Sequence, residues 1–262
     1  MDFIVIALVA CLASLLTFFS GFGLGTILTP AFVLFFPPEM AIALTGIVHL
    51  LNNLFKLGLV GKHINLKVLL AFGIPAFFTA YLGASLLLGL AHDEALWQYE
   101  LAGTTYSVLP VNLVIAGLML IFAIQELIPQ WRNIALSNKW LIPGGMLSGF
   151  FGGLSGHQGA LRSIFLLRTG LTKEAFIATG VSIACLVDVS RLSRYFFDFT
   201  TSSATITGNL PILITATLAA FVGAIIGKKV LTKITINFVQ VSVAVLMIII
   251  SIGLGLGILS KH

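Results

Sequence analysis

The chain has 262 residues, of which 58% are hydrophobic and only 9% are charged, and its mean hydropathy is +1.10. Soluble domains have roughly 45–50% apolar and 25% charged residues, so this composition excludes a soluble globular protein. The formal net charge of +5 comes from 14 Lys and Arg residues that mostly border apolar runs. That placement is typical of membrane topology signals, and it does not indicate a nucleic-acid partner.

The first apolar segment, residues 3–36, is interrupted by the run Ser20-Gly-Phe-Gly-Leu-Gly25. No basic stretch precedes it, so we expect residues 3–19 to be retained and not removed as a signal peptide. Backbone that leaves the helix inside a bilayer has no water to satisfy it, and survives only where protein buries it or where it lines a wet cavity. We therefore expect a broken helix or a re-entrant hairpin here.

Further apolar segments follow at 40–59, 66–91 and 108–128, with a long acidic link from His92 to Ser107. After a polar stretch at 129–140, residues 141–168 form a second broken segment, interrupted by Gly152-Gly-Leu-Ser-Gly-His-Gln-Gly159. The last three segments are 175–197, 205–227 and 236–259. This predicts an all-α, polytopic membrane protein.

The two halves of the chain resemble each other beyond the breaks. Glu39–Gly46 (EMAIALTG) corresponds to Glu174–Gly180 (EAFIATG), and Ala80–Ala84 (AYLGA) corresponds to Ala220–Ala224 (AFVGA). Their shared order indicates an internal duplication. We predict one transmembrane domain, residues 1–262, built from a first repeat at 1–128, a linker at 129–140 and a second repeat at 141–262.

Charge placement favours one topology. If each broken segment enters the membrane and returns, one side holds Lys62, Lys67, Arg132, Lys139, Arg168, Lys173, Lys228, Lys229 and Lys233. The other side holds Asp2, Glu39, Asp93, Glu94, Glu100 and Asp198. The positive-inside rule makes the first set cytoplasmic, although Arg191, Arg194 and Lys261 do not follow it. Each half then crosses an odd number of times. This predicts inverted repeats in a multi-pass inner-membrane protein, with both termini outside.

Paired breaks at matching places in two halves indicate the binding site of a secondary transporter. A half-helix that starts at a break directs backbone N–H groups and a positive dipole end into the membrane centre, where they favour an anion. Arg162, in the first turn after the second break, adds a full charge. The candidate anion-binding residues at the breaks are Gly21, Gly23, Gly25, Gly156, His157, Gln158, Gly159 and Arg162. Close helix packing is the alternative explanation for the glycines.

Two polar stripes follow the breaks. His49, Asn52, Asn53 and Lys56 share one face of a helix, as do Asp188, Arg191 and Tyr195. A mid-membrane charge costs roughly 2.5–3.5 kcal/mol, so Asp188 and Arg191 are expected to pair or to face water. His49, Asn53, Asp188 and Arg191 form a second group of candidate binding residues, with a static structural pair as the alternative. Lys56 is expected to snorkel towards the membrane surface.

Another interpretation comes from Gly153-Leu-Ser-Gly156, which matches the G-x-S-G around the nucleophile of rhomboid intramembrane proteases. Ser155 needs a base within hydrogen-bond reach, and only His49 in an earlier helix is a candidate. No Cys/His spacing indicates a metal site, no ATP-binding motif is present, and no cofactor is expected.

A hydrophobic helix, a glycine-rich break, a short apolar run and a turn into an Ala-rich Thr-Gly helix, all duplicated, resembles the sulfite exporter TauE/SafE family of membrane permeases. Gly21–Gly25, Pro30 and Pro37-Pro38 follow the family pattern, whereas the second half has Gly156-His-Gln-Gly159, Arg162 and Phe165 where members have glycines and a proline. The resemblance implies transport of sulfite, an organosulfonate or a related small anion.

The sequence thus predicts a secondary transporter, not an enzyme, that moves a small anion by alternating access. Its expected partners are the anionic substrate, the lipid bilayer and a coupling proton or sodium ion. A serine intramembrane protease and a passive anion channel are the alternatives.

Overall fold

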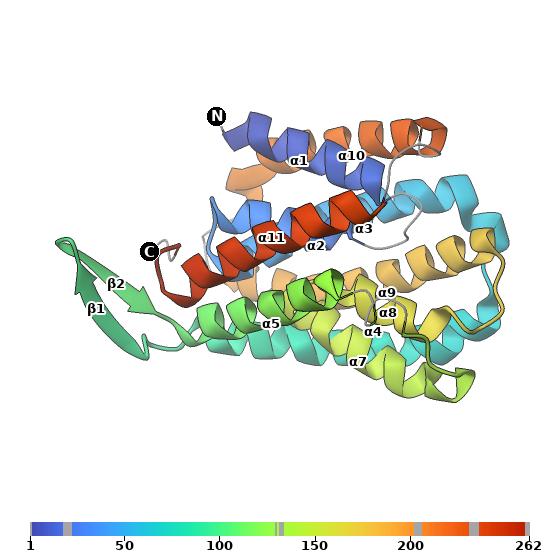
Figure 1. Cartoon of the computed structure of the whole chain (residues 1–262), viewed down its shortest axis with the longest axis horizontal. Coiled ribbons are helices and arrows are strands. Elements are labelled where there is room, and N and C mark those ends of the chain that lie inside the picture. Colours follow the sequence, from blue (N-terminus) through green and yellow to red (C-terminus); the bar gives the residue numbers. More distant parts are fainter. Residues whose placement is uncertain are drawn as a thin grey trace.

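The computed structural model describes residues 2–17, 23–128, 130, 134–201, 206–230 and 236–259 (Figure 1). In chain order, its helices are α1 (Asp2–Leu16), α2 (Leu24–Val33), α3 (Pro38–Val60), α4 (Leu66–Ala91), α5 (Pro110–Leu127), α7 (Leu141–Ser155), α8 (Gln158–Leu166), α9 (Lys173–Thr201), α10 (Leu210–Val230) and α11 (Ile236–Gly255). Short 3-10 turns lie at Gly61–His63, Asn138–Trp140 and Ile206–Asn209. Five of the described helices are long and apolar enough to cross a bilayer. The protein is therefore an all-α, polytopic membrane protein, as predicted.

Both glycine breaks interrupt helices. Gly23 has a φ of 110° immediately before α2, and Gly156 has a φ of 79° between α7 and α8. These left-handed conformations strain any residue with a Cβ, so glycine at each position lets the chain turn sharply. The predicted breaks are confirmed in the described residues, which do not include 18–22.

Each broken segment enters the helix bundle and returns. The backbone N–H of Leu136 donates to the carbonyl of Ile164 (2.9 Å), and the ring of Phe165 packs on Gly144, so α8 leads back to where α7 began. In Figure 1, α1 and α2 make a similar excursion from the opposite end of the molecule. The start of α2 and the start of α8 consequently lie in the interior of the bundle.

Helices of the first half of the chain pack against helices of the second half. Helix α1 packs against α10, α4 against α7, α3 against α9, and α5 against α11. Helices α4 and α7 run parallel, and their backbones touch at three glycines of α7. A Cβ on any of these glycines would overlap a carbonyl oxygen of α4. The contacts are Gly145 with Phe72, Gly149 with Ala76, and Gly153 with Ala80. For Gly153, the close-packing explanation of the second glycine run is therefore correct.

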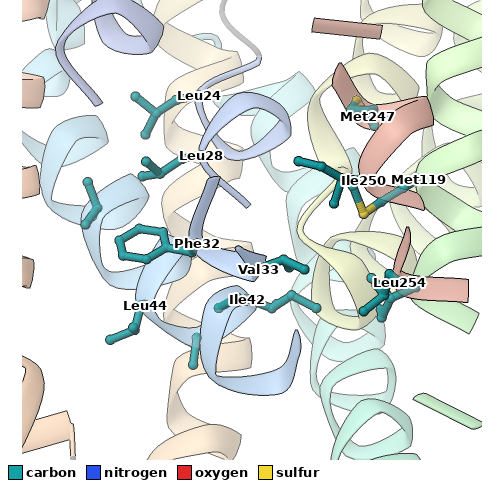
Figure 2. Close-up of a cluster of buried hydrophobic side chains, with 14 of the residues drawn as sticks. Leu24, Leu28, Phe32, Val33, Ile42, Leu44, Met119, Met247, Ile250 and Leu254 are labelled. Carbon is teal, nitrogen blue, oxygen red and sulfur yellow. The ribbon is translucent and has the colours of Figure 1, made fainter. Parts of the chain in front are cut away.

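Helix α2 is embedded in the apolar core. Figure 2 shows Leu24, Leu28 and Phe32 of α2 next to residues of α3, with Met119 of α5 and Met247 of α11 nearby. These side chains are fully or almost fully buried. This packing holds the short helix in place although it does not cross the membrane.

One element was not predicted. The acidic link contains a β-hairpin, β1 (Trp97–Leu101) paired antiparallel with β2 (Thr104–Val108). Its turn residues, Ala102 and Gly103, both have positive φ, as a two-residue hairpin turn requires. The Tyr99 hydroxyl donates to the carbonyl of Leu256 (2.6 Å), which fastens the hairpin to the end of α11.

Candidate functional site

The described interior contains a group of polar side chains that we call the central polar cluster. It consists of His49, Asn53 and Lys56 from α3, Gln158 and Arg162 from α8, and Asp188 and Arg191 from α9. None of these residues is more than 7% exposed. Ionisable groups are costly in lipid, so such groups face the bundle interior and bind one another.

Asp188 is the centre of this cluster. Its Oδ2 accepts a hydrogen bond from His49 Nδ1 (2.6 Å), and its Oδ1 accepts from Arg191 Nη2 (2.7 Å) and Nε (3.0 Å). Gln158 Nε2 also donates to Oδ1 (3.2 Å). The predicted pairing of Asp188 with Arg191 is therefore confirmed, and the carboxylate joins α3, α8 and α9.

Asn53 contacts the ring of His49 from one turn further along α3. Its Nδ2 lies 3.1 Å from Nδ1 and 3.3 Å from Nε2 of that ring. Asn53 therefore packs its amide against the imidazole that binds Asp188.

Arg162 approaches the cluster from the first turns of α8. Its Nη1 donates to Gln158 Oε1 (3.4 Å), and its Nε lies 3.5 Å from where a Cβ on Gly180 would stand. Lys56 lies close enough for the two cations to repel each other. The cluster thus holds two arginines, one lysine and one carboxylate. The other buried acid among the described residues, Glu126, lies in the last turn of α5.

The two breaks meet beside this cluster. A Cβ on Gly25 would stand 3.2 Å from the carbonyl oxygen of Gly156 and 4.0 Å from His49 Cδ2. A Cβ on Gly156 would stand 3.2 Å from Arg191 Nη1. The N-cap residues Gly23 and His157 make no side-chain cap to α2 or α8. The first-turn N–H groups of both helices therefore receive no acceptor from the usual capping position.

The structure brings most of the predicted site residues together. Gly25, Gly156, Gln158, Arg162, His49, Asn53, Asp188 and Arg191 lie at the meeting of the breaks or in the cluster, Gly23 forms the turn before α2, and Gly159 lies in the first turn of α8. His157 differs because its ring stacks on Phe122 of α5, with centroids 5.2 Å apart. Gly21 lies outside the described residues.

Sequence reasoning misjudged or missed several residues here. Lys56 is only 4% exposed, so the expectation that it snorkels to the surface is wrong. Gly46 makes room for Arg191, whose Cζ lies 3.2 Å from where a Cβ would stand, whereas a Cβ on Gly180 would meet Arg162 Nε at an ordinary contact distance of 3.5 Å. Both glycines follow a threonine in the two matching stretches of sequence. These Thr-Gly pairs could have indicated residues close to the site, but they were used only to predict a duplication.

Ser155 has contacts that do not suit a nucleophile. It is fully buried, and its hydroxyl donates to the carbonyl of Phe151 (3.0 Å). His157 Nδ1 lies 3.2 Å from the same oxygen. Since the single hydroxyl proton is directed at Phe151, the histidine nitrogen is the donor of this pair, which is the reverse of a general base. No group of three His, Cys, Asp or Glu side chains close enough to hold a metal ion occurs within the described ranges.

Comparison with known proteins identifies the family. The family model of the sulfite exporter TauE/SafE matches residues 6–254, which is nearly the whole chain. No curated protein and no solved structure matches it. Together with the membrane-spanning helices and the interior break geometry, this match shows that the chain belongs to the sulfite exporter TauE/SafE family and is an integral, multi-pass membrane transport protein.

Proposed function

We propose that this protein carries a small sulfur-containing anion, such as sulfite or an organosulfonate, across the inner membrane by alternating access. The observation that carries the proposal is the convergence of two helix starts on a buried cluster in which cations outnumber carboxylates. Family membership supports the class of substrate. The anion is proposed to bind between Gly25 and Gly156, close to Arg162 and Arg191.

Electrostatics supports an anion at this position. Each helix start carries the equivalent of about half a positive charge, and this field is stronger where water is excluded. Asp188 offsets Arg191 through two short hydrogen bonds, so Arg162 supplies the excess positive charge. Gln158 connects Arg162 to Asp188, which holds the two charged groups in a fixed relation.

Burial of the cluster supports a carrier that must change conformation. Asp188 and Arg191 have no exposed surface, so a substrate reaches them only after helices separate. The backbone contact between α4 and α7 favours their moving as one unit, because parting them would break an interdigitated interface. We propose that opening occurs between α3 and α9, which are joined by polar contacts such as His49 to Asp188.

We further propose that the chain consists of two inverted repeats with both termini outside. The exchanged packing of α1 with α10 and of α4 with α7 supports the duplication. The ends of α3 and α8 and the start of α7 lie at the end of the molecule opposite the hairpin (Figure 1). Exposed Lys62, Lys139 and Arg168 are next to these helix ends in the sequence, whereas Asp93 and Glu94 directly precede the hairpin. The positive-inside rule makes the lysine-rich end cytoplasmic.

The proposal is tested with purified protein in proteoliposomes that contain radiolabelled sulfite. Wild-type protein is expected to give saturable flux, and Arg162→Ala is expected to abolish it, while Arg162→Lys retains part of it. Arg168→Ala, which removes an exposed arginine, serves as the matched control. Equal unfolding temperatures of the variants show that loss of flux is not loss of fold. Wild-type flux in Arg162→Ala would refute the assigned site.

Counterflow separates a carrier from a passive channel. Only a carrier accumulates labelled anion inside the vesicles in exchange for an internal excess of unlabelled anion that flows out. Imposed pH and sodium gradients in the same vesicles identify the coupling ion, which is proposed to be a proton or Na⁺. Stimulation by one gradient alone assigns it, and stimulation by neither contradicts coupling.

A further inference from the structure

Two buried threonine hydroxyls have no hydrogen-bond partner within the described structure. Thr29 of α2 and Thr45 of α3 are both fully buried, and the Oγ1 of each lacks a donor or acceptor contact. Hydroxyls in the middle of a helix normally bond back to a carbonyl three or four residues earlier. Several other described hydroxyls follow this rule, including Thr79 to Pro75, Ser182 to Ala178 and Thr215 to Pro211. Thr217 of α10 is a further buried hydroxyl without a partner, but it does not lie beside either glycine break.

The two threonines also lie at the meeting of the breaks. Thr29 Oγ1 is 3.5 Å from where a Cβ on Gly156 would stand, a position that Arg191 Nη1 approaches to 3.2 Å. Thr45 Cγ2 is 3.9 Å from where a Cβ on Gly25 would stand. The Thr29 hydroxyl therefore borders Gly156, and the Thr45 side chain borders Gly25 through its methyl group.

A buried hydroxyl without a partner destabilises the folded state, because it loses its bonds to water and gains none. Two residues with such groups beside one position are suited to a partner that binds and leaves. A transported ligand is such a partner. The surrounding cations make it an anion, and the hydroxyls act as hydrogen-bond donors to it.

We infer that Thr29 and Thr45 donate hydrogen bonds to separate oxygen atoms of the bound anion and so select oxoanions over halides. The inference rests on the proposed function and names the feature of the substrate that is recognised. An anion with several oxygens accepts from both hydroxyls and from a guanidinium at once, whereas a halide has one accepting centre. A site built to bond such oxygens discriminates strongly against a ligand that leaves its donors unpaired.

The test uses Thr29→Val, Thr45→Val and the double variant, which remove the hydroxyls while preserving shape. Thr215→Val is the matched control, because its hydroxyl bonds to the carbonyl of Pro211. Sulfite uptake into proteoliposomes is measured at several concentrations, with chloride as a competitor. Thermal unfolding without ligand is measured in parallel.

Each single variant is expected to raise the KM for sulfite at least tenfold and to increase inhibition by chloride relative to wild type. Without ligand, both variants should unfold at the wild-type temperature or above, since an unpaired polar group has been removed. Active wild-type protein with unchanged KM and chloride inhibition in the variants overturns this inference alone. Absence of wild-type sulfite flux contradicts the inference together with the proposed function.

Discussion

Replacing Asp188 by Asn removes the only carboxylate of the central polar cluster while keeping its shape. In the structure, Asp188 receives hydrogen bonds from His49, from Gln158 and twice from Arg191. The substitution therefore leaves the Arg191 guanidinium buried without its counter-charge. It also weakens every contact that depended on the negative charge.

Two contributions to the change in unfolding free energy can be compared. An ordinary interhelical hydrogen bond in a membrane protein contributes about 0.6 kcal/mol, so the bonds from His49 and Gln158 together account for roughly 1 kcal/mol. Removing one partner of a buried ion pair costs about 3–5 kcal/mol, because the other charge stays buried and uncompensated. The ion-pair contribution dominates. We expect Asp188→Asn to lower the free energy of unfolding by about 4 kcal/mol, roughly a thousandfold in the equilibrium constant.

The assay is SDS-induced unfolding of the purified protein, followed by circular dichroism. The double variant Asp188→Asn with Arg191→Met should recover most of the lost stability, since a buried pair replaced by neutral groups of similar size is often neutral in stability. Sulfite flux should stay at least tenfold below wild type in both variants, because the single variant loses the carboxylate that holds Arg191 beside Gly156 and the double variant loses Arg191 itself. A double variant as unstable as the single one contradicts the energetic reasoning. Normal flux in the double variant shows that the pair is purely structural.

Three further predictions follow from other parts of the molecule. Gly149→Ala should lower the free energy of unfolding by about 1–3 kcal/mol because the new methyl overlaps the α4 backbone, whereas Gly89→Ala, with open space around it, should have no such effect in the same SDS titration. In a background without the two native cysteines, Glu94→Cys should react with an impermeant maleimide added to intact cells, and Lys139→Cys only after permeabilisation; the reverse result inverts the topology. Ser155→Ala should retain sulfite flux, and a fluorophosphonate probe should leave the wild type unlabelled; covalent labelling restores the protease interpretation.

Helix positions and the breaks were readable from the sequence for a simple physical reason. Long apolar runs have few structural options in a bilayer, and glycines clustered at mid-membrane depth interrupt them at positions such as Gly23 and Gly156. Pro38 and Pro110 open α3 and α5 where a missing N–H costs nothing. The β-hairpin in the acidic link was harder to predict because its Ala102-Gly103 turn lacks the Asn-Gly or Asp-Gly signature of a hairpin.

Only part of the site could be predicted from the sequence. Residues one or two helical turns apart, such as Asp188 and Arg191, could be paired from spacing alone. Contacts between halves could not, because the approach of His49 to Asp188 depends on how α3 crosses α9. Lys56 was misjudged for the same reason, since its place near the helix end indicated exposure, but the structure buries it. The unpaired hydroxyl of Thr45 is visible only once every neighbour is in place.

The exchange of partners between α1 and α10, and between α4 and α7, has a consequence for biogenesis. When the ribosome has made residues 1–128, the surface of α4 that later packs against Gly145, Gly149 and Gly153 of α7 is still uncovered. Helix α1 does not yet have α10 as a neighbour. The first part of the chain must therefore remain in the lipid, incompletely packed, until the second part has been synthesised and inserted. Maturation is coupled to completion of synthesis, and a truncated product is exposed to membrane quality control.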